Sequence, residues 1–313
     1  MLADRAFMGS STKARRRRIF RREDAPLWIM ALPGAVALII FMYVPMLGLL
    51  IAFQDFNVGK GIFGSVFVGM ANFKFLFSTT DAYIITRNTV LYNLAFITVN
   101  MVVAVALALM LSELLSSKTA KTLQTIYMLP YFLSWAVVAI ILMGFIERDY
   151  GMINRAMGTK IDYYRQREFW PGLLVFVNAW KNVGYSTVLY LAVISGISHE
   201  YYEAAMIDGA GKLKQAFYIT IPHLRFIIGI SLIMAMGSIF RGDFGLFYVV
   251  TRNTGRLYPV TDVIDTYIYR SLINIGNVGM STAAGLYQSA VGLILVLAVN
   301  SVVSKIDPDS AMF

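Results

Sequence analysis

The sequence predicts an all-α integral membrane protein with six transmembrane helices and a cytoplasmic helix–elbow–helix loop between the fourth and fifth helices. Two observations predict this class. The 313 residues are 58% hydrophobic and only 14% charged, whereas about a quarter of the residues of a soluble domain are charged. The apolar residues also gather in runs of about 20, the length that a helix needs to cross the hydrocarbon core of a bilayer.

Five apolar segments are long enough to cross a membrane, and a sixth is short. The five are residues 28–53, 89–111, 126–146, 170–194 and 283–303. The sixth, residues 226–240, needs part of residues 241–250 to reach across. Pro33 and Pro45 interrupt the first segment, and we expect kinks there, because neighbouring groups can satisfy the carbonyls that proline frees in membrane helices.

The net charge of +9 is concentrated at the N-terminus, where eight of the 27 lysines and arginines fall within the first 22 residues. A basic run next to an apolar run predicts a cytoplasmic tail rather than a nucleic-acid site. Six spans then place the C-terminus in the cytoplasm as well. We expect a multi-pass protein of a bacterial-type cytoplasmic (inner) membrane, with a basic tail (1–27), a transmembrane domain (28–305) and a short C-terminal tail (306–313).

Residues 261–272, between the last two spans, carry apolar side chains at helical spacing but are too short and too polar to cross a membrane. They predict a helix that lies on the outer interface or lines a vestibule. A plain connecting helix packed on the bundle explains the same pattern.

The loop over residues 199–222 is predicted to be a helix, a turn and a second short helix. Good helix formers with early acidic residues extend to Ile207. The sequence Asp208-Gly209-Ala210-Gly211 supplies the turn. Pro222 is expected to end the second helix. Such a loop would present a rigid elbow to the cytoplasm.

The spacing within this loop resembles the cytoplasmic signature of importer-type ABC permeases. The matching positions are Glu203, Ala204, Ala205, Gly209, Ile219, Ile221 and Pro222. The family usually has leucine in place of Ile221. The resemblance implies that the elbow is the coupling helix, which docks on an ATPase subunit. The residues that it implies for this contact are Glu203, Ala204, Ala205, Asp208, Gly209, Ala210 and Gly211.

Further motifs over most of residues 28–305 resemble the branch of these permeases that handles oligo- and polysaccharides, including the alginate-type importers. They are Leu32-Pro-Gly, Tyr43-Val-Pro-Met, Met128-Leu-Pro-Tyr, Tyr150-Gly-Met-Ile-Asn, Asp262-Val-Ile-Asp-Thr-Tyr and Gly285-Leu-Tyr-Gln-Ser. The resemblance implies a saccharide substrate, with an acidic glycan as one candidate. The implied partners are a second permease (a paralogue), two ATPase subunits and an extracytoplasmic solute-binding protein.

The chain lacks the residues that would make it an ATPase. A phosphate loop needs glycine, four residues, and then Gly-Lys-Ser/Thr. In the nearest approach Met206 replaces the first glycine and Leu213 replaces the hydroxyl residue. We therefore expect no catalytic residue, no metal and no cofactor on this chain, and ATP and Mg are expected on the partner ATPase. The absence of cysteine also excludes a thiolate metal site.

Polar residues within the spans are candidates for a substrate pathway, because such groups are costly in a membrane. In the fourth span, four of them recur at helical spacing and predict one polar face. Amides can bind sugar hydroxyls, and aromatic rings can stack under a sugar ring. A polar helix–helix contact would explain the same face. The residues are Asn178, Lys181, Asn182 and Tyr185, with Trp180 nearby.

Two further pairs are weaker candidates. Arg241 and Asp243 could gate a vestibule, contact a binding protein, or form a local ion pair around Gly242. Tyr287 and Gln288, in the last span, could face the pore.

Other classes fit the sequence less well. A secondary, ion-coupled carrier is the main alternative, but such carriers usually place carboxylates within their spans, and these spans contain none. A membrane-embedded enzyme would need clustered acids or a His/Ser constellation, which the sequence does not show. A scaffold subunit would have no use for a rigid elbow.

Overall fold

The computed structural model describes residues 25–114 and 117–306, and most of this part is helical. Its two strands are very short, β1 (Gln54–Asp55) and β2 (Val66–Phe67), and they pair in antiparallel fashion. The all-α class is therefore confirmed. Residues 1–24 and 307–313, which hold most of the expected basic tail and of the C-terminal tail, lie outside the described residues.

The chain divides into two units, residues 1–49 and 50–313. In the first unit α1 (Ala25–Leu38) passes through Pro33 without ending, and is followed by η2 (Ile39–Tyr43) and by the start of η3 (Val44–Phe53). Around Pro45 the hydrogen-bond pattern changes from α to π and then to 3₁₀. Such local changes are how a membrane helix accommodates a proline.

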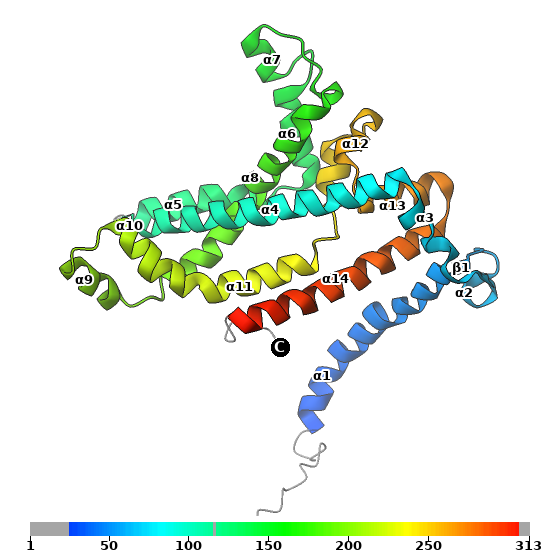
Figure 1. The fold of residues 1–313 in the computed structure, drawn as a ribbon, viewed down its shortest axis with the longest axis horizontal. Helices are drawn as coiled ribbons and strands as arrows, with labels where there is room; N and C mark the ends of the chain where they lie inside the picture. Colours follow the sequence, from blue (N-terminus) through cyan, green and yellow to red (C-terminus); the bar gives the residue numbers. More distant parts are fainter. Residues whose placement is uncertain (1–24, 115–116, 307–313) are drawn as a thin grey trace, which may run out of the picture. The chain divides into compact units, whose positions relative to one another are not determined.

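The second unit is built on two pairs of helices that lie side by side (Figure 1). In one pair, α4 (Thr80–Ser112) packs along α8 (Trp170–Ile194). In the other, α11 (Ile221–Gly237) packs along α14 (Val278–Ile306). The hydroxyl of Thr79 accepts a hydrogen bond from the Ala82 amide and caps the start of α4.

The third predicted span is bent rather than straight. Over residues 118–146 the helix breaks between η5 (Leu129–Phe132) and α6 (Trp135–Ile146), and the two parts differ in direction by 102°. Pro130 lies in η5, and Ser134 caps the new helix by accepting from the Val137 amide. So sharp a bend was not predicted, because most of the segment is uniformly apolar.

The fifth predicted span gains its length from the opposite end to the one expected. The helix is continuous from Lys212 to Gly237, through α10 (Lys212–Gln215), η8 (Ala216–Thr220) and α11. The expectation that Pro222 ends the second loop helix was therefore wrong. Pro222 falls in the first turn of α11, directly after the π-helical η8. The wider π turn accommodates the missing N–H and the bulk of the ring.

Four helices of the described chain are long and apolar enough to cross a membrane, or five if the bent pair counts as one span. The fourth predicted span corresponds to α8 and has the predicted bounds. It is not among these helices, because the polar residues at its centre lower its mean hydropathy. The four helices that are long and apolar enough are Pro26–Phe53, Thr80–Ser112, Lys212–Gly237 and Val278–Lys305.

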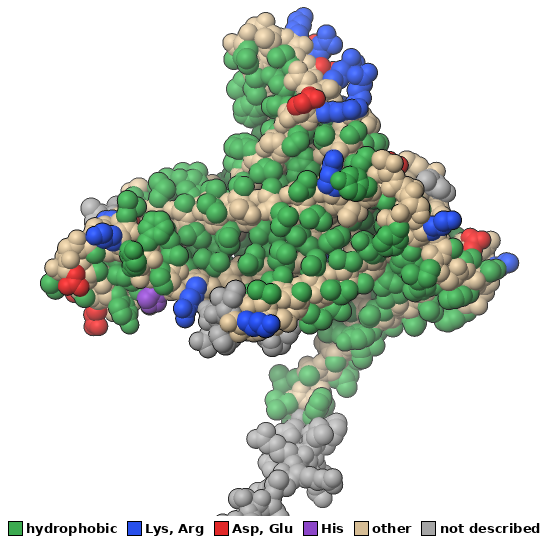
Figure 2. Space-filling model, viewed as in Figure 1, with side chains coloured by type: hydrophobic (Ala, Val, Ile, Leu, Met, Phe, Trp, Pro, Cys, Tyr) green, Lys and Arg blue, Asp and Glu red, His purple; other side chains and the backbone are tan. Residues whose placement is uncertain are grey.

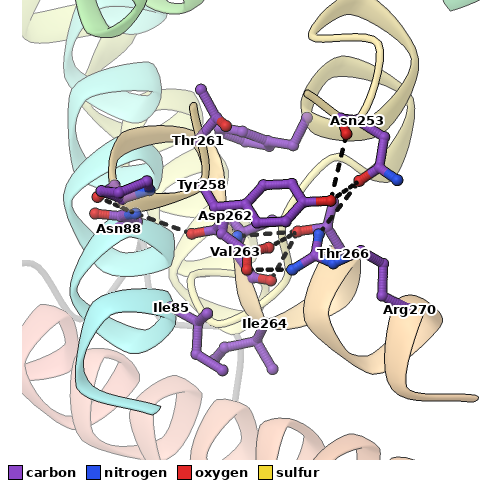
Figure 3. A network of polar contacts seen from close by, with 12 residues as sticks. Ile85, Asn88, Asn253, Tyr258, Thr261, Asp262, Val263, Ile264, Thr266 and Arg270 are labelled. Carbon is purple, nitrogen blue, oxygen red and sulfur yellow. Dashed lines mark hydrogen bonds and ion pairs between the residues drawn. The ribbon is translucent and has the colours of Figure 1, made fainter. Parts of the chain in front are cut away.

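The helix expected near residues 261–272 is α13 (Ile264–Arg270), which polar contacts hold against α4. Figure 3 shows this network. Arg270 forms an ion pair with buried Asp262, and its guanidinium lies 3.9 Å from the centroid of the Tyr258 ring. The Asn88 side chain of α4 donates to the Asp262 carbonyl at 2.9 Å. The segment after α11 is thus fixed to the helix bundle.

The remaining elements are α5 (Ser117–Met128), which forms the first part of the bent third predicted span, and shorter segments that connect the long helices. The shorter segments are α2 (Gly61–Gly64), η4 (Gly69–Phe73), α3 (Phe75–Ser78), α7 (Met152–Met157), η6 (Tyr163–Arg165), η7 (Arg167–Phe169), α9 (His199–Ile207), η9 (Gly245–Val250), η10 (Gly255–Leu257), α12 (Tyr258–Thr261) and η11 (Ser271–Ile275). Figure 2 shows lysine and arginine side chains gathered at the end of the molecule that holds α7.

Candidate functional site

A cavity of about 500 Å³ lies among α4, α8, α11 and the turn that follows α11, and is called the polar cavity here for its asparagine and charged side chains. It brings together Asn178, Asn182, Arg241 and Asp243 from the residues that the sequence singles out. The structure adds two asparagines of α4 that sequence reasoning missed, Asn93 and Asn100. Their spacing of seven residues, within an otherwise apolar run, was the available signal.

The asparagines of the cavity are ordered by hydrogen bonds between and within helices. Asn100 donates to the side-chain oxygen of Asn178 at 2.9 Å, which joins α4 to α8. Asn182 donates to the backbone carbonyl of Asn178 at 3.0 Å. Amide groups from two helices therefore face one polar cavity, and such groups can exchange their present partners for the hydroxyls of a ligand.

Lys181 does not line this cavity. Its ammonium group is buried and donates to the carbonyls of Pro130, Tyr131 and Leu133, at 3.4, 2.7 and 2.6 Å. The break between η5 and α6 leaves the carbonyls of Tyr131 and Leu133 without helical partners, whereas the Pro130 carbonyl also accepts from the Leu133 amide. The cation thus occupies the bend of the third span and satisfies its free acceptors.

The predicted polar face of α8 is consequently divided between two environments. Tyr185 stacks on Tyr131, with ring centroids 4.7 Å apart, on the same side as Lys181. Trp180 lines a separate apolar cavity of about 380 Å³. Only Asn178 and Asn182 of the predicted set on α8 reach the polar cavity.

The turn Arg241-Gly242-Asp243 forms one wall of the polar cavity and is held from both sides. Asn93 donates to the carbonyls of Ile239 and Arg241, at 2.9 and 3.0 Å. The amide of Gly242 donates to the Asp265 carboxylate at 2.5 Å. A Cβ atom at residue 242 would lie 2.6 Å from Val263, so this close approach requires glycine.

Two carboxylates near this turn already have partners. Asp243 accepts from the Leu246 amide at 3.3 Å. No ion pair joins Arg241 to Asp243 within the described ranges, so the local-pair interpretation finds no support there. Burial raises the pKa of Asp265, while the Gly242 amide, Gln288 and the charge of Arg241 lower it.

The two candidates of the last span do not reach the cavity. Gln288 is buried and donates to the Phe240 carbonyl at 2.7 Å and to Asp265 at 3.1 Å. Tyr287 packs edge-on against Phe77 and Phe240, with centroids 5.9 and 6.1 Å away. Gln288 instead supports the turn that carries Arg241.

The helix–elbow–helix loop has a well-defined turn. Ser198 caps α9 by accepting from the Glu200 amide. At the other end, the amides of Gly209 and Ala210 donate to the carbonyls of Met206 and Ala205, at 3.0 and 2.8 Å. Gly209 has a φ of +77°. This is a Schellman motif, in which the left-handed position favours glycine.

The loop presents apolar side chains to its surroundings. The residues Ile207, Leu213 and Tyr218 are 87%, 76% and 81% exposed. Figure 2 shows acidic and apolar side chains at the end of the molecule that holds α9. Exposed apolar side chains in such a cluster are typical of a surface that binds another protein. None of the nine residues of α9 is buried.

One ion pair joins the loop to the end of α4. Lys212, at the start of α10, lies 2.8 Å from Glu113, at the C-cap of α4. A cleft of about 570 Å³ lies between these elements, lined in part by His199, Tyr202 and Glu203. The loop thus contacts the same helix whose middle lines the polar cavity.

With this geometry established, comparison with known proteins identifies the class. Residues 101–308 match the family described as the binding-protein-dependent transport system inner membrane component. The polygalacturonan/rhamnogalacturonan transport system permease protein YteP of Bacillus subtilis (strain 168) is 34% identical over 299 residues, which cover 94% of this chain and 92% of that protein.

Solved structures agree. A crystal structure of a bacterial ABC transporter involved in the import of the acidic polysaccharide alginate holds a chain with a TM-score of 0.83 and 29% identity, covering 91% of this chain and 97% of that one. A bacterial alginate ABC transporter in complex with an alginate pentasaccharide-bound periplasmic protein gives a TM-score of 0.82 at 29% identity, covering 91% and 96%.

The chain belongs to the family of binding-protein-dependent transport system inner membrane components. It is a permease subunit of an ABC importer and not an enzyme, since ATP hydrolysis in this class falls to a separate subunit. The Glu-Ala-Ala motif at residues 203–205 is typical of the family.

Proposed function

We propose that this chain pairs with a second permease, a paralogue, to form the membrane pathway of an ATP-driven saccharide importer. Two ATPase subunits, which use ATP and Mg, and an extracytoplasmic solute-binding protein complete the assembly. The observation that carries this proposal is the asparagine-lined cavity joined through α4 to an exposed loop bearing the family motif. Relatives that transport polygalacturonan/rhamnogalacturonan and import alginate support a saccharide substrate.

The proposal includes the membrane topology. The chain crosses six times, with α8 as the fourth span and both termini in the cytoplasm. Burial of Lys181 and Asn178 inside the bundle supports this, because the polar centre of α8 then avoids lipid. The basic N-terminal residues support the orientation.

The loop is proposed to couple ATP hydrolysis to transport. Glu203, Ala204, Ala205 and the elbow from Asp208 to Gly211 would dock on the ATPase. Its exposed apolar side chains and its Schellman turn support this role, because a rigid protrusion can transmit a movement of the partner.

The polar cavity is proposed as part of the substrate pathway. Asn178 and Asn182 would bind saccharide hydroxyls together with Asn93 and Asn100. Lys181, Tyr185 and Trp180 would act on the pathway indirectly, through the shape of α8 and of the bent third span.

Replacing Gly209 with valine tests the coupling role. A β-branched residue is strained at a φ of +77°, at a cost of about 1–2 kcal/mol or more, so the elbow should change shape. We expect tagged Gly209→Val chain, purified in mild detergent, to lose co-purifying ATPase subunits or substrate-stimulated ATP hydrolysis.

Gly211→Ala is the matched control. Residue 211 has a φ of −69°, and a Cβ atom there would meet nothing within 4 Å. This variant should keep its ATPase. Normal coupling in Gly209→Val would contradict the proposed role of the elbow.

A further inference from the structure

Arg241 differs from Asp243, the other charged residue of the cavity lining, in that no hydrogen bond or ion pair within the described residues holds its side chain, although its charge acts on the nearby Asp265 carboxylate. It lines the cavity and is exposed. Within residues 25–114 and 117–306 its guanidinium forms neither an ion pair nor a hydrogen bond. Asp243, the other charged residue of the lining, accepts the Leu246 amide and has Lys181 as its nearby cation.

The backbone that carries Arg241 is fixed before any ligand arrives. Its carbonyl accepts from Asn93, and the next amide donates to Asp265, which Gln288 also holds. The lack of room for a Cβ atom at Gly242 keeps this turn against Val263. A group positioned in this way loses little freedom on binding, which favours affinity.

We propose that Arg241 binds a carboxylate of the transported saccharide, so that the cavity selects sugars that carry uronate groups. This inference rests on the proposed saccharide pathway and adds to it a residue and a charge requirement. A guanidinium can bind a carboxylate through two parallel hydrogen bonds. The cavity volume of about 500 Å³ is within the usual range for small-ligand sites, and the asparagines can hold the hydroxyls.

The absence of cysteine from the chain permits a direct binding test. Ser186, which also lines the cavity, is replaced by cysteine as a reporter, and the assembled transporter is placed in nanodiscs without the binding protein. The rate of its reaction with methyl methanethiosulfonate is then measured with and without trigalacturonate, and with the carboxyl-reduced, neutral trisaccharide. Transporter without the reporter gives the background from the other subunits.

We expect trigalacturonate to slow labelling of the reporter, and Arg241→Gln to raise the concentration needed for this protection about tenfold or more. Arg241→Lys, which keeps the charge, should raise the trigalacturonate concentration needed for protection by a smaller factor. Any protection by the neutral trisaccharide should be the same with and without the substitution. Unchanged protection by trigalacturonate in Arg241→Gln, or no protection in the parent reporter, would overturn the inference.

ATP-dependent saccharide uptake by the wild-type transporter, measured alongside, separates the two levels of the argument. Failure of that uptake speaks against the proposed function. Normal uptake together with charge-independent protection overturns only the role of Arg241. A purely structural role of Arg241 predicts equal loss of protection by the acidic and the neutral sugar.

Discussion

At the scale of single residues, the buried charge of α8 has a structural explanation. Lys181 supplies three donors, and the bend of the third span supplies three carbonyls. The charge also lies 5.3 Å from the centroid of the Trp135 ring, in a favourable position over an aromatic face. Lys181 of α8 thus marks the break between η5 and α6.

Replacing Lys181 with methionine should destabilise the protein. The side chain keeps its length but leaves buried carbonyls unsatisfied, which costs about 1–3 kcal/mol. We expect a lower thermal midpoint in detergent, measured by fluorescence-detected size-exclusion chromatography after heating. Lys118→Met, at an exposed position of α5, is the control and should leave the midpoint unchanged. Equal midpoints for the two variants would show that the bend does not depend on this cation.

The conformation of a single residue could be predicted from the sequence where it depends only on neighbouring residues in the chain. The left-handed turn at Gly209 followed from Asp-Gly-Ala-Gly alone, since glycine is the residue that such a turn requires. The roles of Lys181 and Gln288 could not be predicted in the same way. The acceptors of Lys181 lie 48 to 51 residues away along the chain, and those of Gln288 lie 48 and 23 residues away. Only the fold shows that these acceptors come within hydrogen-bonding distance.

At the scale of elements, close packing of α8 on the bent span fixes both. Gly184 lies against the backbone of the preceding segment, and a Cβ atom there would be 1.9 Å from the Tyr127 carbonyl oxygen. Lys181 and Gly184, three residues apart, therefore face the same neighbour. Lys181 satisfies carbonyls of the bent segment, and Gly184, which lacks a side chain, lets the two backbones come close together.

Gly184→Ala should disrupt this packing. Because the obstacle is backbone and cannot rotate away, we expect a loss of at least about 1–3 kcal/mol, seen as poor yield and a lower thermal midpoint. Gly172→Ala, in the same helix with nothing within 4 Å, should be tolerated or slightly stabilising, because alanine favours a helix over glycine. A Gly184→Ala protein as stable as Gly172→Ala would contradict the close contact.

Helix boundaries were predicted correctly for α8 and were not predicted around Pro130 and Pro222. The bounds of α8 agree with the expected segment 170–194. Pro222 misled the prediction because a π-helical turn precedes it and lets the helix continue. The bend near Leu133 gave no warning, since apolar residues flank it on both sides.

At the scale of the whole molecule, α4 joins the two proposed functional regions. Its 33 residues extend over about 50 Å. Asn93 and Asn100 line the polar cavity near its middle, and Glu113 meets Lys212 of the loop at its end. A displacement of the loop by an ATPase would therefore reach the cavity along one rigid helix.

The class of protein could be predicted from the sequence because the residues that indicate it are adjacent in the chain, in the apolar runs and in one loop motif. The cavity did not, because three helices and a turn contribute to it. Residues 178 and 182 were found from the polarity of one helix. Their partners on α4 become meaningful only when α4 and α8 lie side by side.

ATP-driven import is tested most directly by saccharide uptake into vesicles that hold the reconstituted transporter. Proteoliposomes holding this chain, its partner permease and the ATPase subunits would be given ATP inside, and trigalacturonate with the binding protein outside. We expect uptake that requires both ATP and the binding protein, and we expect Gly209→Val to abolish it. Uptake that continues without ATP and follows an ion gradient would contradict it and indicate a secondary carrier.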